Sequence, residues 1–452
     1  MTLWSDFAYC GGATSIDVSL AYYGDDFTGS TDVIETLARG GVAAELFVEA
    51  EGVSAAFGGT GIHSRQAVGV AGMSRTFSPA QLDESLPAAF AALGKLQPRF
   101  IHYKVCSTFD SSPTVGNIGR AMEIGRRAFP APWTPLVVAA PHLGRYCAFG
   151  NLFARTGSLS EVHRLDRHPT MQRHPVTPMD EADLRMVLAQ QTDLRVTLVD
   201  LLKVEEGVEA VAAAVERAPE GIVLFDAVNA NHMATIGGAL LYLQGREGAP
   251  LFVAGSSGVE AALVAAWGTD RSSRSSVRPP PVDKLLVISG SRSPTTARQI
   301  AAACHEGFVD LPLDDAGFGD SVENDAALTA IADRAVAQLR AGRSTIVRPN
   351  ECDWGARAGS MLGRLLGRIA EKILAAVRLE RVIVAGGDSS GEIARQLRIT
   401  SLTMLAPLAP GAPLCRVRSS LSSVDGLGFV FKGGQVGQDD FFVSALTPSA
   451  SP

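Results

Sequence analysis

The sequence lacks an excess of positive charge. Its 452 residues include 40 Lys and Arg against 47 Asp and Glu, a formal net charge of −7. Proteins that neutralise nucleic-acid phosphates usually carry a basic excess, so this balance argues against a general nucleic-acid binder. With 46% hydrophobic and 19% charged residues, the chain has enough apolar material for ordinary buried cores and too little charge for a disordered protein.

Cysteine pairs, a leader sequence and long apolar runs are also missing. The 6 cysteines are scattered without CxxC spacing, so neither a zinc knuckle nor a disulfide framework is expected, and a reducing compartment is the default. The N-terminus has no basic stretch leading into an apolar one. Gly, Ser and Glu interrupt the apolar segment Leu251–Trp267 well before the ~18 residues of a membrane span. These absences predict a cytoplasmic protein that binds no membrane.

Two nucleotide-binding fingerprints and the protein-kinase motifs are absent. The sequence contains no GxxxxGK[ST] segment, which excludes a P-loop protein, and no GxGxxG segment opening a βαβ unit. It also lacks the HRD and DFG motifs of protein kinases. Any phosphate-binding turn in this chain therefore belongs to another superfamily.

Short apolar runs alternate with segments of helical period along most of the chain. Such alternation is typical of βαβ units, so we expect an α/β fold of two domains, each with a largely parallel sheet flanked by helices and with the active site in the cleft between them. The expected strands are Val18–Tyr23, Ala44–Val48, Phe100–Lys104, Leu136–Ala140, Val196–Val199, Ile222–Phe225, Lys284–Ile288, Thr345–Arg348, Arg381–Ala385 and Gly428–Phe431, and the expected helices include Asp32–Arg39, Val115–Ala128 and Glu181–Gln191.

One segment interrupts the alternation. The stretch RSSRSSVRPPPV, residues 271–282, is polar and then rich in proline, which is typical of a linker between domains. We therefore expect an N-terminal domain over residues 1–270 and a C-terminal domain over 283–452. In parallel sheets ligands bind beyond the carboxyl ends of the strands, so the residues that follow each strand are the candidates for chemistry.

The segment YYGDDFTGSTD places Asp25 and Asp26 directly after the first strand. Thr28 or Ser30 is the expected cap of a helix that begins near residue 31. Two carboxylates at this edge could accept a substrate hydroxyl, remove its proton or hold a magnesium-bound water. The competing interpretation is one capping aspartate beside one solvated aspartate.

Basic residues follow in two further segments. Arg65, in HSR, has the guanidinium suited to a substrate carboxylate, although a solvated surface arginine is the competing interpretation. The segment YKVCSTFDSSPTVGNIG places Lys104 near a strand end and then a polar loop before Pro113, where a helix is expected to start. This loop could cradle a small polyhydroxy anion, or it could be a serine-rich turn with capping duties. Its polar residues are Ser107, Thr108, Asp110, Ser111 and Ser112.

Glycine-rich turns and a repeated RHP element complete the candidates. RHPTMQRHPVTPM, residues 167–179, is either an anion-binding loop over the cleft or a structural crossover, and a zinc site there lacks further ligands. In the C-terminal part, the glycine-rich segments 289–300 and 385–397 follow a strand and precede a helical pattern, so the N–H groups of their turns suit an anion. Together with FKGGQVGQDDFF, residues 431–442, they favour a nucleotide site.

These segments, in this order, resemble those of the four-carbon acid sugar kinase family. GDDFTGSTD, KVCSTFDSSPTVGNIG, RHPxxxRHPVTPM, GSRSPTTARQ, GGDSSGE and FKGGQxG run from near residue 20 to near residue 442, so the resemblance spans both expected domains. It implies an N-terminal domain that binds a sugar acid, a C-terminal domain that binds ATP, and phosphorylation of a hydroxyl on an acid such as threonate, erythronate, 3-oxo-tetronate or 3-oxo-isoapionate.

The resemblance also implies roles for individual residues. Asp25 and Asp26 fall in the acidic substrate motif, with Asp26 ahead of Asp25 as the acceptor of the hydroxyl proton. Arg65 falls at the carboxylate-binding arginine, and Mg²⁺ would accompany ATP. The substrate-binding set is Asp25, Arg65, Lys104, Ser107, Thr108, Phe109 and Asp110. The nucleotide-binding set is Ser291, Ser293, Gly386, Gly387, Asp388, Ser389, Gly433 and Gly434.

Two departures and two alternatives stay open at this point. Arg292 stands where a small residue is usual, and Thr170–Gln172 differs from the common loop sequence, which weakens any argument about the exact substrate. A sugar-acid dehydrogenase or isomerase could use the same substrate loop. Such an enzyme would need a dinucleotide fingerprint or a metal cluster, and this sequence contains neither. A non-catalytic sugar-acid sensor would leave three phosphate-type turns without a purpose. A homodimer is the default assembly.

Overall fold

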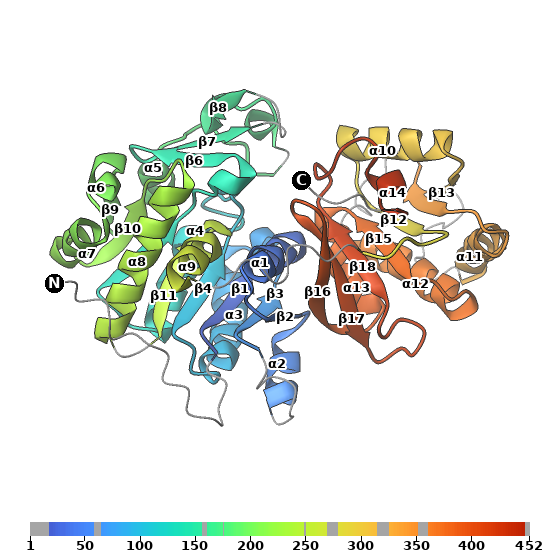
Figure 1. Ribbon diagram of the computed structural model, residues 1–452, viewed down its shortest axis with the longest axis horizontal. Helices are drawn as coiled ribbons and strands as arrows, with labels where there is room; N and C mark the ends of the chain where they lie inside the picture. Colours follow the sequence, from blue (N-terminus) through green and yellow to red (C-terminus); the bar gives the residue numbers. More distant parts are fainter. Residues whose placement is uncertain are drawn as a thin grey trace.

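The computed structural model describes residues 18–57, 65–155, 161–174, 176–247, 250–268, 279–313, 325–350 and 360–447. Within these ranges, no helix is long and apolar enough to cross a membrane. Strands and helices alternate through both halves of the chain, which lie side by side in Figure 1. Of the expected linker, only residues 279–282 belong to the described part.

The N-terminal half is built on eight parallel strands in the order β2-β3-β1-β4-β11-β5-β10-β9. Strands β1, β3, β4, β10 and β11 are buried along their whole length, as expected for a parallel sheet covered on both faces. The strands are β1 (Leu20–Gly24), β2 (Ala44–Phe47), β3 (Ala67–Ala71), β4 (Phe100–Lys104), β5 (Trp133–Val137), β9 (Val196–Val199), β10 (Gly221–Phe225) and β11 (Leu251–Gly255).

Helices cover both faces of this sheet, and a small antiparallel sheet of β6 (Arg145–Ala148), β7 (Asn151–Arg155) and β8 (Val162–Arg164) lies beside it. The helices are α1 (Phe27–Arg39), α2 (Ala50–Phe57), α3 (Pro79–Gly94), α4 (Ile118–Ala128), α5 (Leu184–Ala189), α6 (Leu201–Glu205), α7 (Val208–Arg217), α8 (Ala230–Glu247) and α9 (Gly258–Trp267), with single 3₁₀ turns at 74–76, 141–143, 165–167 and 171–173.

The C-terminal half has five parallel strands in the order β13-β14-β12-β15-β18, extended by the antiparallel hairpin β17-β16. Its strands are β12 (Leu286–Ser289), β13 (Val309–Leu313), β14 (Thr345–Pro349), β15 (Arg381–Ala385), β16 (Ile399–Ala409), β17 (Ala412–Ser419) and β18 (Gly428–Lys432). Its helices are α10 (Pro294–His305), α11 (Asp325–Arg340), α12 (Ser360–Ala376), α13 (Gly387–Gln396) and α14 (Phe441–Ser444).

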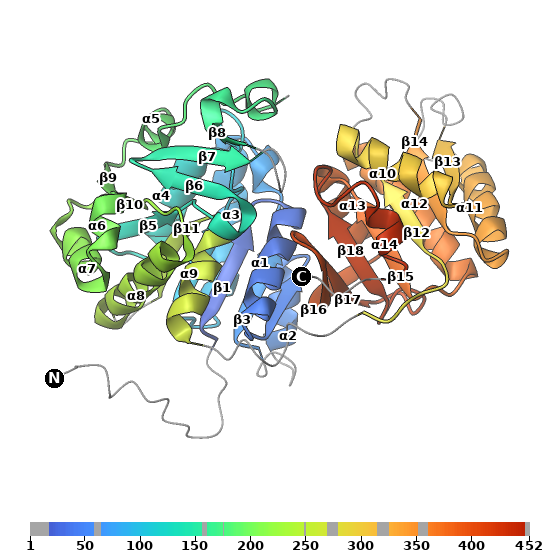
Figure 2. The same cartoon turned by 45° about the horizontal axis from the view of Figure 1, so that its top comes forward.

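One edge-to-edge contact joins the two halves into a single 15-stranded sheet. Strand β16 pairs antiparallel with β2, where Leu402 lies opposite Leu46 and Ser401 opposite Phe47. Figure 2 shows the β16–β17 hairpin between the two sets of helices. The predicted α/β class with two largely parallel, helix-flanked sheets is confirmed, and the continuous sheet is a feature that the sequence did not predict.

Element bounds differ most from the predictions at one strand, β5, which spans Trp133–Val137 rather than Leu136–Ala140, and at helix starts. Helix α1 begins at Phe27, well before residue 31, and Asp26 is its N-cap. Helix α4 begins at Ile118 behind the cap Asn117, so Pro113 does not start a helix. The predicted helix 181–191 is reduced to residues 184–189. In each case polar residues next to the helix offered several plausible caps, and local sequence does not choose among them.

Candidate active site

The topology of each half creates a crevice at the carboxyl ends of the central strands. From β1 the chain crosses to β2 on one side, whereas from β4 it crosses to β5 on the other. Right-handed crossovers then put α1 on the opposite face from α3 and α4. Helix contacts agree, because α1 packs on α9 while α3 packs on α4. The same reversal occurs between β12 and β15, with α10 and α13 on opposite faces. Ligands bind at such switch points.

In the N-terminal crevice Asp26 is fixed by the start of α1. Its Oδ1 accepts the N–H of Gly29 at 2.9 Å and its Oδ2 accepts the hydroxyl of Thr28 at 2.8 Å. The backbone of Asp26 is extended, as an N-cap requires. The predicted caps Thr28 and Ser30 therefore lie inside the helix, and the carboxylate is held by its N-terminal amides.

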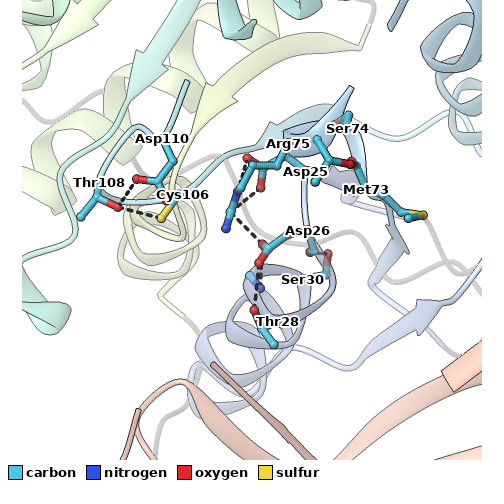
Figure 3. A network of polar contacts seen from close by, with 12 residues as sticks. Asp25, Asp26, Thr28, Ser30, Met73, Ser74, Arg75, Cys106, Thr108 and Asp110 are labelled. Atoms are coloured by element: carbon cyan, nitrogen blue, oxygen red, sulfur yellow. Dashed lines mark hydrogen bonds and ion pairs between the residues drawn. The ribbon is translucent and has the colours of Figure 1, made fainter. Parts of the chain in front are cut away.

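Arg75 binds both aspartates (Figure 3). Its Nη2 donates to Asp25 Oδ1 and to Asp26 Oδ1, each at 2.8 Å, and its Nε donates to Asp25 Oδ2 at 3.2 Å. The N–H of Arg75 also donates to the carbonyl of Asp25 at 3.0 Å. This arginine lies four residues after β3, in the segment GMSR and within a 3₁₀ turn. Strand β3 was not among the strands predicted from the sequence, so the rule that residues after strands carry function did not lead to Arg75.

The pKa values of the two aspartates shift in opposite directions. Burial raises the pKa of Asp25, and the charge of Asp26 adds to the rise, although Arg75 opposes it. Burial alone would also raise the pKa of Asp26, but Arg75, Lys104, Thr28 and the amide of Gly29 outweigh it and leave that pKa below its usual value. Asp26 is also the more exposed, with 16% of its side chain accessible against 3% for Asp25. Asp26 is therefore the more reachable carboxylate, and its lowered pKa keeps it ionised at neutral pH.

Lys104 and the loop after β4 close the other side of the crevice. Lys104 is buried and pairs in register with Gly24, next to the aspartates. A Cβ on Gly29 would lie 2.9 Å from Lys104 Nζ and 2.3 Å from Asp26 Oδ1, so glycine is required there for the amine to approach the carboxylate. In the loop, Thr108 donates to Asp110 Oδ1 at 2.7 Å.

The remaining loop residues have different surroundings. Phe109 is fully buried with φ of 57°, a left-handed conformation. Figure 3 shows Thr108 bonded to Asp110 and Cys106 on one side of Arg75. Ser107 is partly buried. The Cys106 thiol lies 2.9 Å from Thr108 Oγ1, and burial raises its pKa to about 11, so it stays neutral.

The structure does not bring Arg65 to this crevice. Arg65 precedes β3, whereas Asp25 follows β1. Because these strands are parallel neighbours, the two residues lie at opposite ends of the strands, roughly 16 Å apart over the length of five residues. Its Nε instead donates to Glu45 at 3.3 Å, and Glu45 accepts the hydroxyl of Ser401 across the contact between the halves at 2.6 Å. Arg65 therefore neutralises a buried carboxylate at that contact.

A second arginine missed by sequence reasoning is Arg145, at the start of β6. Its Nη1 donates to the carbonyls of Leu143 at 2.8 Å and Arg155 at 3.3 Å, while its Nε is buried without a hydrogen-bond partner among the described residues. Burial lowers the pKa of Arg145, while the charges of Cys106 and Asp110, among others, act against it. It is thus a cation near the Asp110 loop with no carboxylate at ion-pair distance in the described part of the chain.

The RHP segment begins at the end of one 3₁₀ turn, 165–167, and contains a second, 171–173, with a histidine on either side of it. Nδ1 of His168 lies 3.2 Å from the N–H of Thr170, and Nδ1 of His174 lies 3.1 Å from that of Thr177. Both imidazoles therefore accept at Nδ1 and act as turn caps, and burial lowers the pKa of His168. An anion-binding role for this loop stays a prediction.

In the C-terminal crevice the three glycine-rich turns meet. A Cβ on Gly290 or Gly386 would lie 2.4 or 2.6 Å from Ser389 Oγ, and one on Gly434 would lie 2.6 Å from Ser291 Oγ. The hydroxyl of Ser293 caps α10 by accepting the N–H of Thr296 at 3.1 Å, and it also donates to the carbonyl of Gly434. These contacts bring most of the predicted nucleotide-binding residues together around the N-termini of α10 and α13.

The crevice fits a polyphosphate. Ser289 Oγ and Ser389 Oγ are buried without partners among the described residues, and glycines line the cradle where side chains would fill it. Gly433 is partly buried beside Gly434. Asp388 lies in the first turn of α13, but its side chain is outside the described part. Helix N-termini and unpaired hydroxyls are the donors that bind phosphate oxygens.

The two crevices meet at the contact between the halves. A Cβ on Gly387, at the start of α13, would lie 3.8 Å from Thr28 Oγ1, the hydroxyl that donates to Asp26. One residue earlier, Phe27 packs on Phe431 with ring centroids 4.8 Å apart. The N-terminus of α1, which carries the acidic site, therefore lies against the N-terminus of α13, which carries the glycine turn.

Comparisons with known proteins agree with this division. A sugar-binding N-terminal domain family matches residues 20–263, and a nucleotide-binding C-terminal domain family matches residues 286–442. The 3-oxo-isoapionate kinase of Paraburkholderia graminis is 43% identical, over 94% of this chain and 93% of that protein. The 3-oxo-tetronate kinase of Pseudomonas savastanoi pv. phaseolicola is 32% identical, over 93% and 95%.

A solved structure from Salmonella typhimurium LT2 superposes with a TM-score of 0.74 at 25% identity, over 95% of this chain and 98% of that one. Both family matches and the kinase relatives therefore cover the two crevices described above, and the chain belongs to the four-carbon acid sugar kinase family.

Proposed function

We propose that this enzyme transfers the γ-phosphoryl group of ATP to a hydroxyl of a short sugar acid, with 3-oxo-isoapionate as the first substrate to test. The observation that carries the proposal is the approach of Gly387 to Thr28, because it puts a phosphate-type turn beside an ionised carboxylate. The greater identity to the 3-oxo-isoapionate kinase than to the 3-oxo-tetronate kinase supports the branched acid.

In this proposal Asp26 accepts the hydrogen bond of the attacking hydroxyl and takes its proton as the bond to phosphorus forms. Phosphoryl transfer needs mainly positioning and charge stabilisation, so a carboxylate that stays ionised suits this role. Arg75 holds Asp26 in place, and Asp25, more buried and with a raised pKa, anchors the arginine. Asp26 is thus the proposed base ahead of Asp25.

The substrate end of the crevice contains two further cations. Lys104, with Thr108 and Asp110, is proposed to bind the hydroxyls of the acid. Arg75 is already neutralised by two carboxylates, so we assign the substrate carboxylate to Arg145, which has no such partner among the described residues. This assignment replaces the one that the sequence predicted for Arg65.

At the nucleotide end, the turns around Gly290, Gly386 and Gly434 are proposed to hold the triphosphate with their N–H groups and the hydroxyls of Ser289 and Ser389. Mg²⁺ would supply charge neutralisation between the β- and γ-phosphates, and it usually keeps most of its ligands from phosphate and water. The homodimer and the cytoplasmic location expected from the sequence stay predictions.

The test is ADP release in a coupled assay with ATP, Mg²⁺ and a panel of 3-oxo-isoapionate, 3-oxo-tetronates, threonates and erythronates. We expect one acid, 3-oxo-isoapionate first, to give a kcat/KM well above the others. Calorimetric titration with ADP runs alongside. If the protein binds a sugar acid but neither binds ADP nor releases it from ATP, the kinase proposal fails and the sensor interpretation gains.

A further inference from the structure

A lysine is buried beneath the nucleotide crevice. Lys432 ends β18 and is fully inaccessible to solvent. Its ammonium makes one hydrogen bond among the described residues, to Thr296 Oγ1 at 3.3 Å. Two rings of α14, Phe441 and Phe442, lie beside it, with Nζ 5.8 Å from each centroid.

Among the described residues, no carboxylate forms an ion pair with Lys432, and burial is the cause of its lowered pKa. The titratable side chains of α10, Arg298 and His305, have 57% and 87% of their areas accessible. Ahead of α14, Asp439 pairs with Arg298 and is 58% accessible, and Asp440 is exposed. On β15 the neighbour of Lys432 is Ala385. A buried ammonium without a carboxylate is unfavourable, and the positive end of the α10 dipole adds to its cost. A buried ionisable group of this kind beside a ligand site is a candidate for a functional role.

The hydrogen bonds of Lys432 lead directly to the glycine turns. Thr296, its acceptor, donates in turn to the carbonyl of Gly434 at 2.9 Å, and Ser293 donates to the same carbonyl. The carbonyl of Lys432 itself accepts the N–H of Gly386 at 2.9 Å. The lysine therefore lies under the first turn of α10, one layer below the place where the three turns meet.

We infer that Lys432 is the built-in positive charge of the nucleotide-phosphate site, acting through the first turn of α10 rather than by surface contact with the ligand. The inference rests on the proposed kinase function and adds a residue to it. Lys432 is a positioning residue in this scheme, because it stabilises phosphate charge from behind the side chains and amides that touch it.

Nucleotide binding should then be linked to proton uptake. Burial lowers the pKa of Lys432 to about 8, so about half of the unliganded protein carries a neutral amine at pH 8. A polyphosphate nearby favours the ammonium. If only the ammonium form binds tightly, the ADP dissociation constant rises about tenfold between pH 7 and pH 9, since the terminal phosphate of ADP is already ionised there.

The experiment is calorimetric titration of the full chain with ADP and Mg²⁺ at pH 7, 8 and 9, in buffers of different ionisation enthalpy. We expect wild type to take up about half a proton per ADP at pH 8 and to show the tenfold weakening. Lys432→Met should bind ADP weakly at pH 7, with no proton uptake and no pH slope. Lys372→Met removes another lysine of the same half and should behave as wild type.

The outcomes separate this inference from the kinase proposal. Wild type that binds no ADP at any pH would overturn both. If wild type binds ADP without proton uptake and with a flat pH profile, the role of Lys432 alone is overturned. This measurement uses only the wild-type protein, so it does not depend on whether a variant folds. Retention of the wild-type slope in Lys432→Met would have the same meaning.

Discussion

Glu35 links the two halves of the molecule, and its replacement by glutamine should stabilise the protein above neutral pH. Its Oε2 accepts the N–H of Gly411, in the turn of the β16–β17 hairpin, at 2.7 Å. Its Oε1 lies 2.8 Å from Arg39 Nη2, and only 5% of its side chain is accessible. Burial, despite Arg39, raises the pKa of Glu35 from 4.5 to about 7.

The sign and size follow from that shift. Because the folded state binds the proton more tightly than the unfolded state, the stability due to this group is fully present below pH 4.5 and is lost as pH rises through about 7. The rise of the pKa from 4.5 to about 7 corresponds to about 3 kcal/mol. Glutamine keeps the acceptor for Gly411 without the charge, so Glu35→Gln should match wild type near pH 4.5 and exceed it by up to about 3 kcal/mol at pH 8.5.

Urea unfolding at pH 4.5, 6 and 8.5 measures this difference. Glu49→Gln is the control, because Glu49 is 59% exposed on the same half and its loss should leave the pH dependence unchanged. A difference between Glu35→Gln and wild type that is the same at all three pH values, or a less stable variant at pH 8.5, would refute the reasoning.

Three substitutions test the site itself. Asp26→Asn should lower kcat about 10²–10⁴-fold with little change in the KM of either substrate, as measured by steady-state kinetics. A variant with the wild-type kcat would show that Asp26 is not the base. Arg145→Gln should raise the KM of the acid at least about tenfold, as expected for a lost charge-assisted pair, and leave that of ATP unchanged. Its control is Arg126→Gln, which loses similar bonds to the carbonyls of Pro132 and Gly221 at the opposite sheet edge; equal effects would indicate a structural role. Gly386→Ala should abolish ADP binding, because φ of Gly386 is 134° and a Cβ there would lie 2.6 Å from Ser389 Oγ. Its control is Gly387→Ala, where a Cβ would have no atom closer than 3.8 Å, and this variant should retain the fold and the thermal transition of wild type.

The sequence predicts the central strands well because they are buried on both faces. Phe100–Lys104 and Arg381–Ala385 are buried along their whole length and have the predicted bounds. The edge strand Val196–Val199 also has the predicted bounds, although only Val199 is buried there. Helix starts were harder, because Asp26, Thr28 and Ser30 are all good caps and only the folded chain shows that Asp26 accepts the Gly29 amide.

Long-range pairs are what the sequence could not reveal. Arg65 and Arg75 have similar local surroundings, and the choice between them depends on which edge of the sheet each occupies, a property of strand direction and order. Pairing of β2 with β16 brings together residues more than 350 positions apart, and two residue pairs define its register. Lys432 did leave a local sign, a lone lysine at the end of the apolar run GFVF.

Helix α1 couples the contact between the halves to the chemistry. Its N-terminus holds Asp26, its first residue packs on Phe431, and Glu35, two turns later, bonds to Gly411. The spacing between the acidic site and the turn at Gly387 is thus set by a rigid element rather than by loops, as a reaction that depends on in-line positioning requires. A change at Glu35 or Gly411 that tilts α1 should therefore alter kcat while leaving both ligands' affinities in place.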